Sequence, residues 1–196
     1  MDSLKRLNAE VIACRKCPRL VAHRERVARE KVRRYRDEEY WGKPIPGFGD
    51  PKARLLIVGL ALRDCFITAA VWCAPPGNKP TPTELTTCRP YLVEEMRLLR
   101  NVRIVVVLGR IALDAFLKAW GDAGRTAPAR RPAFGHGGLA KLPGDVWLLA
   151  SYHPSQQNTQ TGRLTSAMFQ RIFARVRRML AGPRANRRRE SKRRKV

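Results

Sequence analysis

Four short apolar runs, rich in Val, Ile and Leu, constrain the fold of this chain more than any other feature. The runs cover residues 54–59, 65–71, 103–108 and 146–150. Runs of this length without polar alternation are typical of strands that are buried on both faces of a parallel sheet. Amphipathic helical patterns accompany the later runs, at residues 84–99, 111–120 and 165–180. Strands that alternate with helices predict an α/β fold in which helices cover both faces of the sheet.

One connection does not fit this pattern. Only residues 60–64 lie between the first run and the second, whereas a crossover between parallel strands needs about a dozen residues or more. A tight hairpin would need Gly or Asn in its turn, and among these residues only Asp64 readily takes a positive φ. Either the two strands form a hairpin or a segment is absent, and we infer a deletion near residues 61–62.

Two pairs of cysteines indicate a metal site. Cys14 and Cys17 form a C-x-x-C motif, and Cys73 and Cys88 bracket a Pro-rich loop that follows the second apolar run. Four soft ligands from two distant segments are typical of one closed site. Spacing alone favours zinc, because zinc sites with four cysteines are commoner than iron-sulfur sites. The fifth cysteine, Cys65, is expected to be a buried, small apolar residue.

The 196-residue chain carries 40 Lys and Arg against 16 Asp and Glu, which gives a net charge of +24. An excess of this size indicates an anionic partner, either a nucleic acid or a membrane surface. No apolar run is long enough to span a membrane, and the N-terminus lacks the apolar core of a signal peptide, so we expect a cytoplasmic protein. Residues 183–196 are basic and almost without apolar side chains, which predicts a disordered tail after a folded domain at 1–182.

The fourth apolar run leads directly into Ser-Tyr-His-Pro-Ser at residues 151–155, followed by a polar loop at 156–163. This order places His153 at the carboxyl end of a strand, where pockets form in parallel sheets. A single histidine in such a position is more often structural than catalytic, but the hydroxyls and amides around it suit contact with phosphate and sugar. His136, which stands among glycines, indicates only a loop.

Several stretches of the sequence together resemble one known family. The matching stretches are Cys14-x-x-Cys17-Pro-Arg-Leu, Pro46-Gly-Phe-Gly-Asp-Pro51, Ile57-Val-Gly-Leu-Ala61, Thr68-Ala-Ala-Val-x-Cys-Ala-Pro-Pro-x-Asn-Lys-Pro-Thr-Pro82, Leu108-Gly-Arg-Ile-Ala-Leu113 and Ser151-Tyr-His-Pro-Ser155. They are similar to the motifs of the uracil-DNA glycosylase superfamily, and within it to the iron-sulfur enzymes of family 5. Most of the chain takes part in the resemblance.

The resemblance implies a three-layer sandwich, in which helices flank a central four-stranded parallel sheet. It implies a structural four-iron, four-sulfur (4Fe-4S) cluster on Cys14, Cys17, Cys73 and Cys88, which reverses the preference for zinc and makes residues 73–88 an iron-sulfur-bound loop that touches DNA. It also implies hydrolysis of the N-glycosidic bond of uracil in DNA, with hypoxanthine or other deaminated or damaged bases as further substrates. We therefore expect a monomer that works on DNA in the nucleoid.

The resemblance also assigns roles to individual residues. After the target base has flipped out of the duplex, His153 would donate a hydrogen bond to its carbonyl as the base becomes anionic, and Asn78 would orient water or the base. Ala69 stands where family 4 enzymes carry a base-reading Asn, which implies a broader choice of base. The floor of the pocket would be formed by Gly59, Leu60 and Ala61. The residues expected to contact DNA are Tyr152, Pro154, Ser155, Gln156, Gln157, Asn158 and Arg163.

One segment of the family is missing. In family 5 the Gly-Leu-Ala motif continues into a Gly-rich segment and a helix, which supply an aromatic residue that stacks on the base and an Asp for catalysis. Here Ala61 runs directly into Leu62, at the short connection noted above. Two other interpretations therefore stay open: a catalytically impaired DNA-binding iron-sulfur protein derived from such an enzyme, and a zinc-stabilised nucleic-acid module without enzymatic ancestry.

Overall fold

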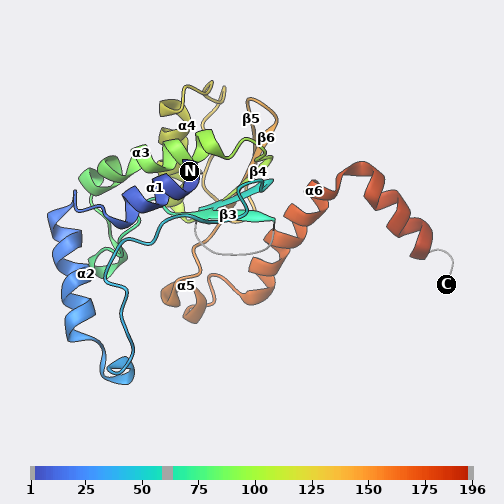
Figure 1. Cartoon of the computed structure of the whole chain (residues 1–196). Coiled ribbons are helices and arrows are strands. Elements are labelled where there is room, and N and C mark those ends of the chain that lie inside the picture. Colours follow the sequence, from blue (N-terminus) through green and yellow to red (C-terminus); the bar gives the residue numbers. More distant parts are fainter. Residues whose placement is uncertain (1–2, 59–63, 194–196) are drawn as a thin grey trace.

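A computed structural model describes residues 3–58 and 64–193 of the chain, and the side chains as far as residue 181 (Figure 1). Its described part centres on a six-stranded sheet in the order β1-β3-β2-β4-β6-β5. The strands are β1 (Phe48–Gly49), β2 (Leu55–Val58), β3 (Cys65–Thr68), β4 (Ile104–Leu108), β5 (Leu139–Leu142) and β6 (Val146–Ser151). β3, β2, β4 and β6 are parallel to one another, whereas β1 and β5 pair antiparallel at the two edges. The predicted four-stranded parallel sheet is confirmed as the centre of a wider sheet.

Helices cover both faces of this sheet, as the alternating pattern predicts (Figure 1). They are α1 (Ser3–Ile12), α2 (Pro18–Glu30), α3 (Pro82–Leu98), α4 (Arg110–Asp122), α5 (Gln156–Gln160) and α6 (Ser166–Arg193), with short 3-10 turns η1 (Arg33–Tyr35) and η2 (Pro76–Asn78). Side chains on one face of the strands, such as Leu56 and Val105, share a buried cluster with residues of α1, α3 and α4. Side chains on the other face, such as Ile57, pack with Ile172 and Val176 of α6.

The strands read as apolar runs because they are buried on both faces. Every residue of β2 and β4 is buried. Burial of one such side chain contributes about 1.5–3 kcal/mol, so the central strands dominate the stability of the fold. Cys65 is 1% exposed at the start of β3, which confirms it as a buried small residue.

β2 and β3 pair in parallel, with Leu55 opposite Cys65 and Val58 opposite Thr68. The hairpin considered for this connection is therefore wrong. A connection between these two parallel strands must run back by about 13 Å, and six residues span at most about 20 Å, so the length of the sequence permits the crossover. Residues 59–63 lie outside the described part, and the deletion near 61–62 stays a prediction.

The last helix, α6, leaves the body of the protein on the side away from α2 (Figure 1). The tail predicted at 183–196 stays untested, because the side chains of these residues lie outside the described part. Within the part of the chain that the structure describes, no helix combines the length and the apolar character that crossing a membrane requires.

Candidate active site

A cleft of about 870 Å³ opens at the carboxyl ends of β2, β4 and β6. It brings together most of the residues predicted from the sequence. Among the residues that line it are Ala69, Asn78, Tyr152, His153, Ser155, Gln156, Gln157, Asn158 and Arg163. Pro154 does not line it, and Gly59, Leu60 and Ala61 lie outside the described residues. The structure thus brings most of the predicted residues to one cleft, and their roles and the predicted pocket floor stay predictions.

His153 stands just beyond the end of β6, on a backbone held from two sides. The Gly109 N–H donates a hydrogen bond to the Ser151 carbonyl oxygen (2.8 Å), which joins the end of β4 to the end of β6. The Asn158 side-chain amide donates to the carbonyl oxygen of His153 itself (2.8 Å). The backbone on either side of the histidine is thus fixed before any ligand binds.

The ring of His153 is accessible from the cleft, and no described residue forms a hydrogen bond with it. Partial burial against the walls of the cleft lowers the pKa of the imidazole below its ordinary value. The ring is therefore neutral at pH 7, with one N–H to donate. A neutral donor that is not already engaged suits an acceptor on a ligand in the cleft.

His136 contacts the end of β6 without lining the cleft. Its Nδ1 accepts a hydrogen bond from the Tyr152 N–H (3.4 Å) and lies 3.4 Å from the Ser151 hydroxyl. The two rings of His136 and Tyr152 are tilted against each other with centroids 5.2 Å apart. The sequence indicated only a loop at His136, because nothing local shows that the ring reaches a strand end fifteen residues later.

Cationic and aromatic side chains form one wall of the cleft. The Arg163 guanidinium lies 4.9 Å from the centre of the Tyr152 ring, and the Arg110 guanidinium lies 5.3 Å from that of Phe134. Cations held over aromatic faces keep a defined position while their N–H groups stay available to an anion. The first turn of α4, from Arg110, lies at the same cleft, and the positive end of its dipole also favours negative charge there.

The Pro-rich loop forms the opposite wall and is tied down at its far end. Thr81 caps α3 by accepting from the Glu84 N–H (3.2 Å), while the Glu84 carboxylate accepts from the Thr81 N–H (2.8 Å). Arg19 of α2 binds both oxygens of that carboxylate, each at 2.7 Å, and also donates to the Lys79 carbonyl oxygen (3.2 Å). Asn78, with φ of +56°, is exposed within the loop and faces the cleft without a side-chain hydrogen bond to any described residue.

The four cysteines predicted as ligands lie in one region behind this loop. Burial raises the pKa of the Cys17, Cys73 and Cys88 thiols, and the neighbouring cysteines of the group raise it further. The pKa of Cys88 rises to about 12. Burial and mutual repulsion of this kind disfavour free thiolates, so the group is suited to a bound cation. Across residues 3–58 and 64–193, however, no three His, Cys, Asp or Glu side chains converge as ligands of one metal ion.

Arg24 of α2 lies inside this region. Its side chain donates to the Cys73 Sγ (3.1 Å) and to the Cys14 carbonyl oxygen (3.0 Å). The residue is 8% exposed. Arg24 thus points inward, which the helical pattern of α2 could not show, because that pattern carries no information about the distant Cys73.

Comparison with known proteins identifies relatives. Residues 54–177 match the family described as the uracil DNA glycosylase superfamily. The chain is 42% identical to the type-5 uracil-DNA glycosylase of Thermus thermophilus, over 85% of this chain and 94% of the relative. It is 40% identical to the type-5 uracil-DNA glycosylase of Mycobacterium leprae, over 87% of this chain and 93% of the relative. The type-4 uracil-DNA glycosylase of Archaeoglobus fulgidus is 32% identical, over 57% of this chain and 62% of the relative.

The length of these alignments adds one fact. The alignment with the Thermus protein spans 211 positions, more than the 196 residues of this whole chain, although only 85% of the chain takes part. The relative therefore contains residues that have no counterpart here.

Proposed function

Since the chain belongs to the uracil-DNA glycosylase superfamily, and within it to the type-5 group, we propose that it is a base-excision repair enzyme that hydrolyses the N-glycosidic bond of uracil in DNA. One structural observation supports this proposal independently of the names of the relatives. His153, a neutral histidine with a free donor, lies at the carboxyl end of β6 in a cleft bordered by cations. Such a cleft can accept a flipped nucleotide and stabilise the anionic base that leaves it.

The chemistry begins with a nucleotide that turns out of the duplex into the cleft, at a cost of a few kcal/mol that is smaller for a mispaired base. The bond between the base and C1′ of the deoxyribose then breaks, and the electron pair stays on the base. The oxygen of a water molecule bonds to C1′, and the proton that this water loses neutralises the anionic base. His153 donates its N–H to the base carbonyl where the negative charge develops. Because Asn158 and Gly109 fix the backbone around it, the donor needs little rearrangement in the transition state.

Asn78 is the second residue that we propose for catalysis, as the group that orients water or the base. Its position at the cleft supports this role, and its positive φ also fits a plain turn residue, since Asn tolerates that conformation. Ala69 lines the same cleft without an amide. We propose that the absence of a base-reading amide at this position lets hypoxanthine or other deaminated bases enter in addition to uracil.

We propose that the loop after His153 holds the DNA backbone. Ser155 accepts from the Asn158 N–H (3.4 Å) and so caps α5, which leaves the amides of Gln156 and Gln157 exposed at the cleft. Arg163 and Arg110 supply positive charge beside them. Contacts of this kind fix the register of a duplex without reading its sequence.

We also propose that Cys14, Cys17, Cys73 and Cys88 hold a structural 4Fe-4S cluster. Two features of the thiols support the fit. They come from two segments that Arg19 and Arg24 already join, and their burial and proximity disfavour free thiolates, as suits ligands of a bound cation. When bound, it would cross-link the N-terminal segment to the Pro-rich loop, and we assign it no step in the reaction.

The experiment that tests this function is single-turnover release of uracil from a labelled duplex with one U·G pair, with protein whose intact mass matches the sequence. We expect release by the parent protein, and loss of release in His153→Ala with duplex binding retained. His23→Ala is the matched control, since His23 lies on α2 beside Arg26 and does not line the cleft. No release by the parent protein, with salt-sensitive DNA binding intact, would overturn the proposal and leave a catalytically impaired DNA-binding protein.

The same preparation tests the cofactor and the assembly. An iron-sulfur protein is brown and absorbs broadly in the blue, whereas a colourless preparation that contains zinc would contradict the cluster. We propose a monomer that works on DNA in the nucleoid, and the mass of the protein-DNA complex in solution tests the stoichiometry.

A further inference from the structure

A second groove, of about 730 Å³, lies at the opposite end of the sheet from the cleft. Residues just before three parallel strands form it. Lys52 and Arg54 precede β2, Arg100 and Arg103 precede β4, and Asp145 precedes β6, while α6 closes the groove with Met179 and Leu180. The groove thus combines four cations with one acid, at an end of the fold that the repair reaction does not use.

Most of these cations have no acidic partner. Lys52, Arg100 and Arg103 are exposed, and their side chains form no ion pair with any described residue. Arg54 pairs with Asp64, and the acid of the groove, Asp145, is already paired with Lys141 (2.8 Å). Three cations with uncompensated charge therefore face one groove.

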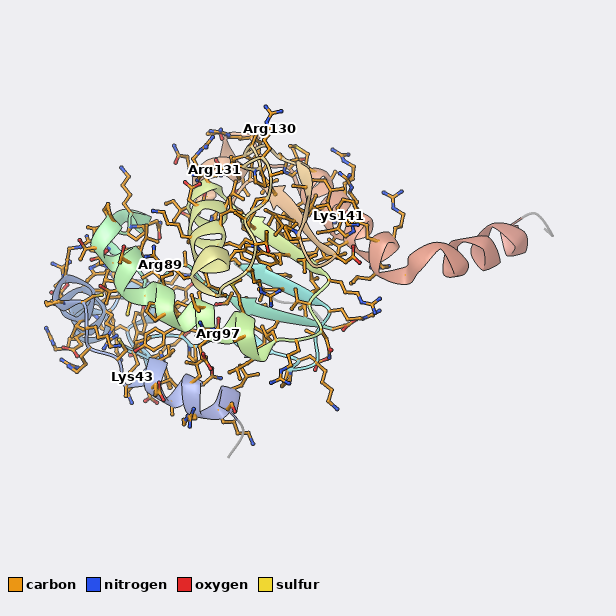
Figure 2. The ribbon with its side chains drawn as sticks, turned by 90° about the horizontal axis from the view of Figure 1, so that it is seen from above. Lys43, Arg89, Arg97, Arg130, Arg131 and Lys141 are labelled. Atoms are coloured by element: carbon orange, nitrogen blue, oxygen red, sulfur yellow. The ribbon has the colours of Figure 1, made fainter. Side chains whose placement is uncertain are left out.

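The basic face formed by α3 and α4 is different. Figure 2 shows Arg89, Arg97 and Arg131 on this face, and each of them has an acidic neighbour. The partners are Asp122 at 2.6 Å, Glu94 at 3.6 Å and Asp114 at 2.7 Å. These pairs satisfy much of the charge locally, so the number of basic residues on a face does not by itself make a binding surface.

Two cations of the groove stand on backbone that the sheet holds in place. The Arg103 N–H donates to the Arg54 carbonyl oxygen and the Trp147 N–H donates to the Arg103 carbonyl oxygen, each at 2.8 Å. These bonds join the starts of the three parallel strands into one edge. Arg54 and Arg103 can therefore face a long anion together, and Lys52 and Arg100 flank them from the turns that precede β2 and β4.

We propose that this groove is a second DNA-binding surface, which holds the phosphate backbone of a duplex other than the one under repair. The two sites lie at opposite ends of the strands, and β4 alone, with five residues, separates them by about 16 Å. In Figure 1 the last part of α6 extends away from α2 and α5, and Met179 and Leu180 of the same helix line the groove. Because the cleft and the groove lie at opposite ends of the strands, we assign the groove to a separate duplex.

The chemistry of the groove favours duplex DNA as its ligand. It offers point charges and guanidinium groups for phosphate, and its one aromatic ring, Trp147, has Lys141 5.8 Å from its centre, so no ring is free to stack on an unpaired base. Recognition would then be independent of sequence and sensitive to salt. The basic residues 183–196 follow directly after Leu180 of the groove in the sequence, which adds positive charge at this end of the chain. A second duplex held here would let the protein pass between DNA segments without release.

The proposal goes beyond base excision but rests on DNA as the ligand. The test is a bridging assay, in which a bead-bound duplex without uracil captures a second, fluorescent duplex only when protein joins the two. The parent protein is compared with a groove variant that carries Lys52→Glu, Arg100→Glu and Arg103→Glu. The control variant carries Lys5→Glu, Lys118→Glu and Arg130→Glu, which are equally exposed cations without acidic partners among the described residues and change the net charge by the same amount.

We expect the groove variant to lose bridging by tenfold or more and the control variant to keep it. The salt dependence of bridging should also weaken by about 0.9 in log-log slope for each phosphate contact removed. Uracil release from a short single duplex, measured in the same samples, should stay unchanged in both variants, which would show that both variants fold.

Equal bridging by the groove variant and the parent, or equal loss in the two variants, would overturn the proposal. Preferential capture of folded RNA would overturn the choice of partner. Absence of uracil release with bridging intact would instead count against the proposed enzyme alone.

Discussion

Gly109 lies directly against His153, so that a Cβ atom added to Gly109 would stand 3.4 Å from the Cβ of the histidine. Gly109 has φ of +98°, precedes the first turn of α4, and donates its N–H to Ser151 at the end of β6. One residue thus sets the distance between the two strand ends that form the cleft. The Leu-Gly-Arg motif around it carries a structural requirement for glycine, because other residues adopt such a φ only with strain.

Replacement of Gly109 by Ala is expected to slow uracil release by about tenfold or more, because a displaced His153 would stabilise the leaving base less well, and tenfold corresponds to about 1.4 kcal/mol in the transition state. The measurement is the single-turnover rate at saturating enzyme. Gly121→Ala is the matched control on the same helix, since no atom lies within 4 Å of its added Cβ. That variant should keep the parent rate and gain about 0.5–1 kcal/mol of stability. Equal rates for both variants would show that the contact at Gly109 does not matter.

His136 is expected to position His153 without touching the substrate. Its Nδ1 accepts the Tyr152 N–H, so His136→Ala leaves a partly buried donor without a partner and should lower the single-turnover rate, while the Kd for DNA stays near that of the parent. His136→Asn, whose side-chain oxygen can accept the same N–H, should restore part of the rate. Failure of Asn to do better than Ala would indicate that packing against Tyr152, not the hydrogen bond, is what His136 provides.

The same residue predicts a pH dependence. Burial lowers the pKa of His136, so Nδ1 is free to accept at pH 7 and becomes protonated only as the pH falls below the ordinary range of histidine. The cations that face it are Arg171 of α6, which also lowers the pKa, and Arg163 beyond the Tyr152 ring. The parent rate should therefore fall at acidic pH as protonated Nδ1 stops accepting the Tyr152 N–H. His136→Asn has no such titration and should make the acidic fall less steep.

The parts of the fold that the sequence predicted are those whose signal is local. β2 and β4 are apolar at every position because both of their faces are buried, and such short runs rich in Val, Ile and Leu favour strands. The edge strands escaped prediction for the opposite reason. β1 has two residues, both exposed, and β5 buries only Leu142 fully. Neither strand carries an apolar pattern that differs from that of a loop.

The residues of the candidate site also divide into those with a local signal in the sequence and those without one. His153 could be placed because the end of a predicted strand fixed its position. Arg24 and His136 could not, because each is defined by a partner far along the chain, Cys73 for the arginine and the backbone of Tyr152 for the histidine. Periodicity describes which face of an element a residue occupies, and it contains no information on which distant group will meet that face.

Arg24→Ala tests the proposed cluster through this contact. The guanidinium donates to Cys73 from a buried position and would offset part of the negative charge of the thiolates when a cluster is bound. We expect the variant to lose its visible absorption in air several-fold faster than the parent. Arg26→Ala on the exposed side of the same helix is the control and should bleach at the parent rate. Identical bleaching of Arg24→Ala and the parent would mean that the arginine serves the fold alone.

Glu95 of α3 is fully buried beneath the Pro46–Pro51 motif, and it is a carboxyl group that the proposed reaction does not use. Its side chain accepts a hydrogen bond from the Thr68 hydroxyl at the end of β3, and Gly47 packs so closely that an added Cβ would stand 2.1 Å from its Oε1. Burial raises the pKa of Glu95 to about 8, against the partial opposing effect of the Thr68 and Gly47 hydrogen bonds. The carboxyl is therefore protonated in the folded protein at neutral pH and ionised in the unfolded chain.

This difference predicts how stability changes with pH. The folded state binds one proton more than the unfolded state between the ordinary pKa of about 4.5 and the folded value of about 8. Glu95 thus contributes stability at low pH that is lost as the pH rises through this window, at up to about 1.4 kcal/mol per pH unit. Glu95→Gln keeps the shape of the side chain and removes its titration. The free energy of unfolding of this variant in urea, relative to that of the parent, should therefore rise from pH 5 to pH 8 and level off above pH 8. Glu94→Gln, at the neighbouring and 42% exposed position beside Arg97, should follow the parent at every pH. A constant difference between Glu95→Gln and the parent over this range would show that the buried carboxyl does not hold its proton.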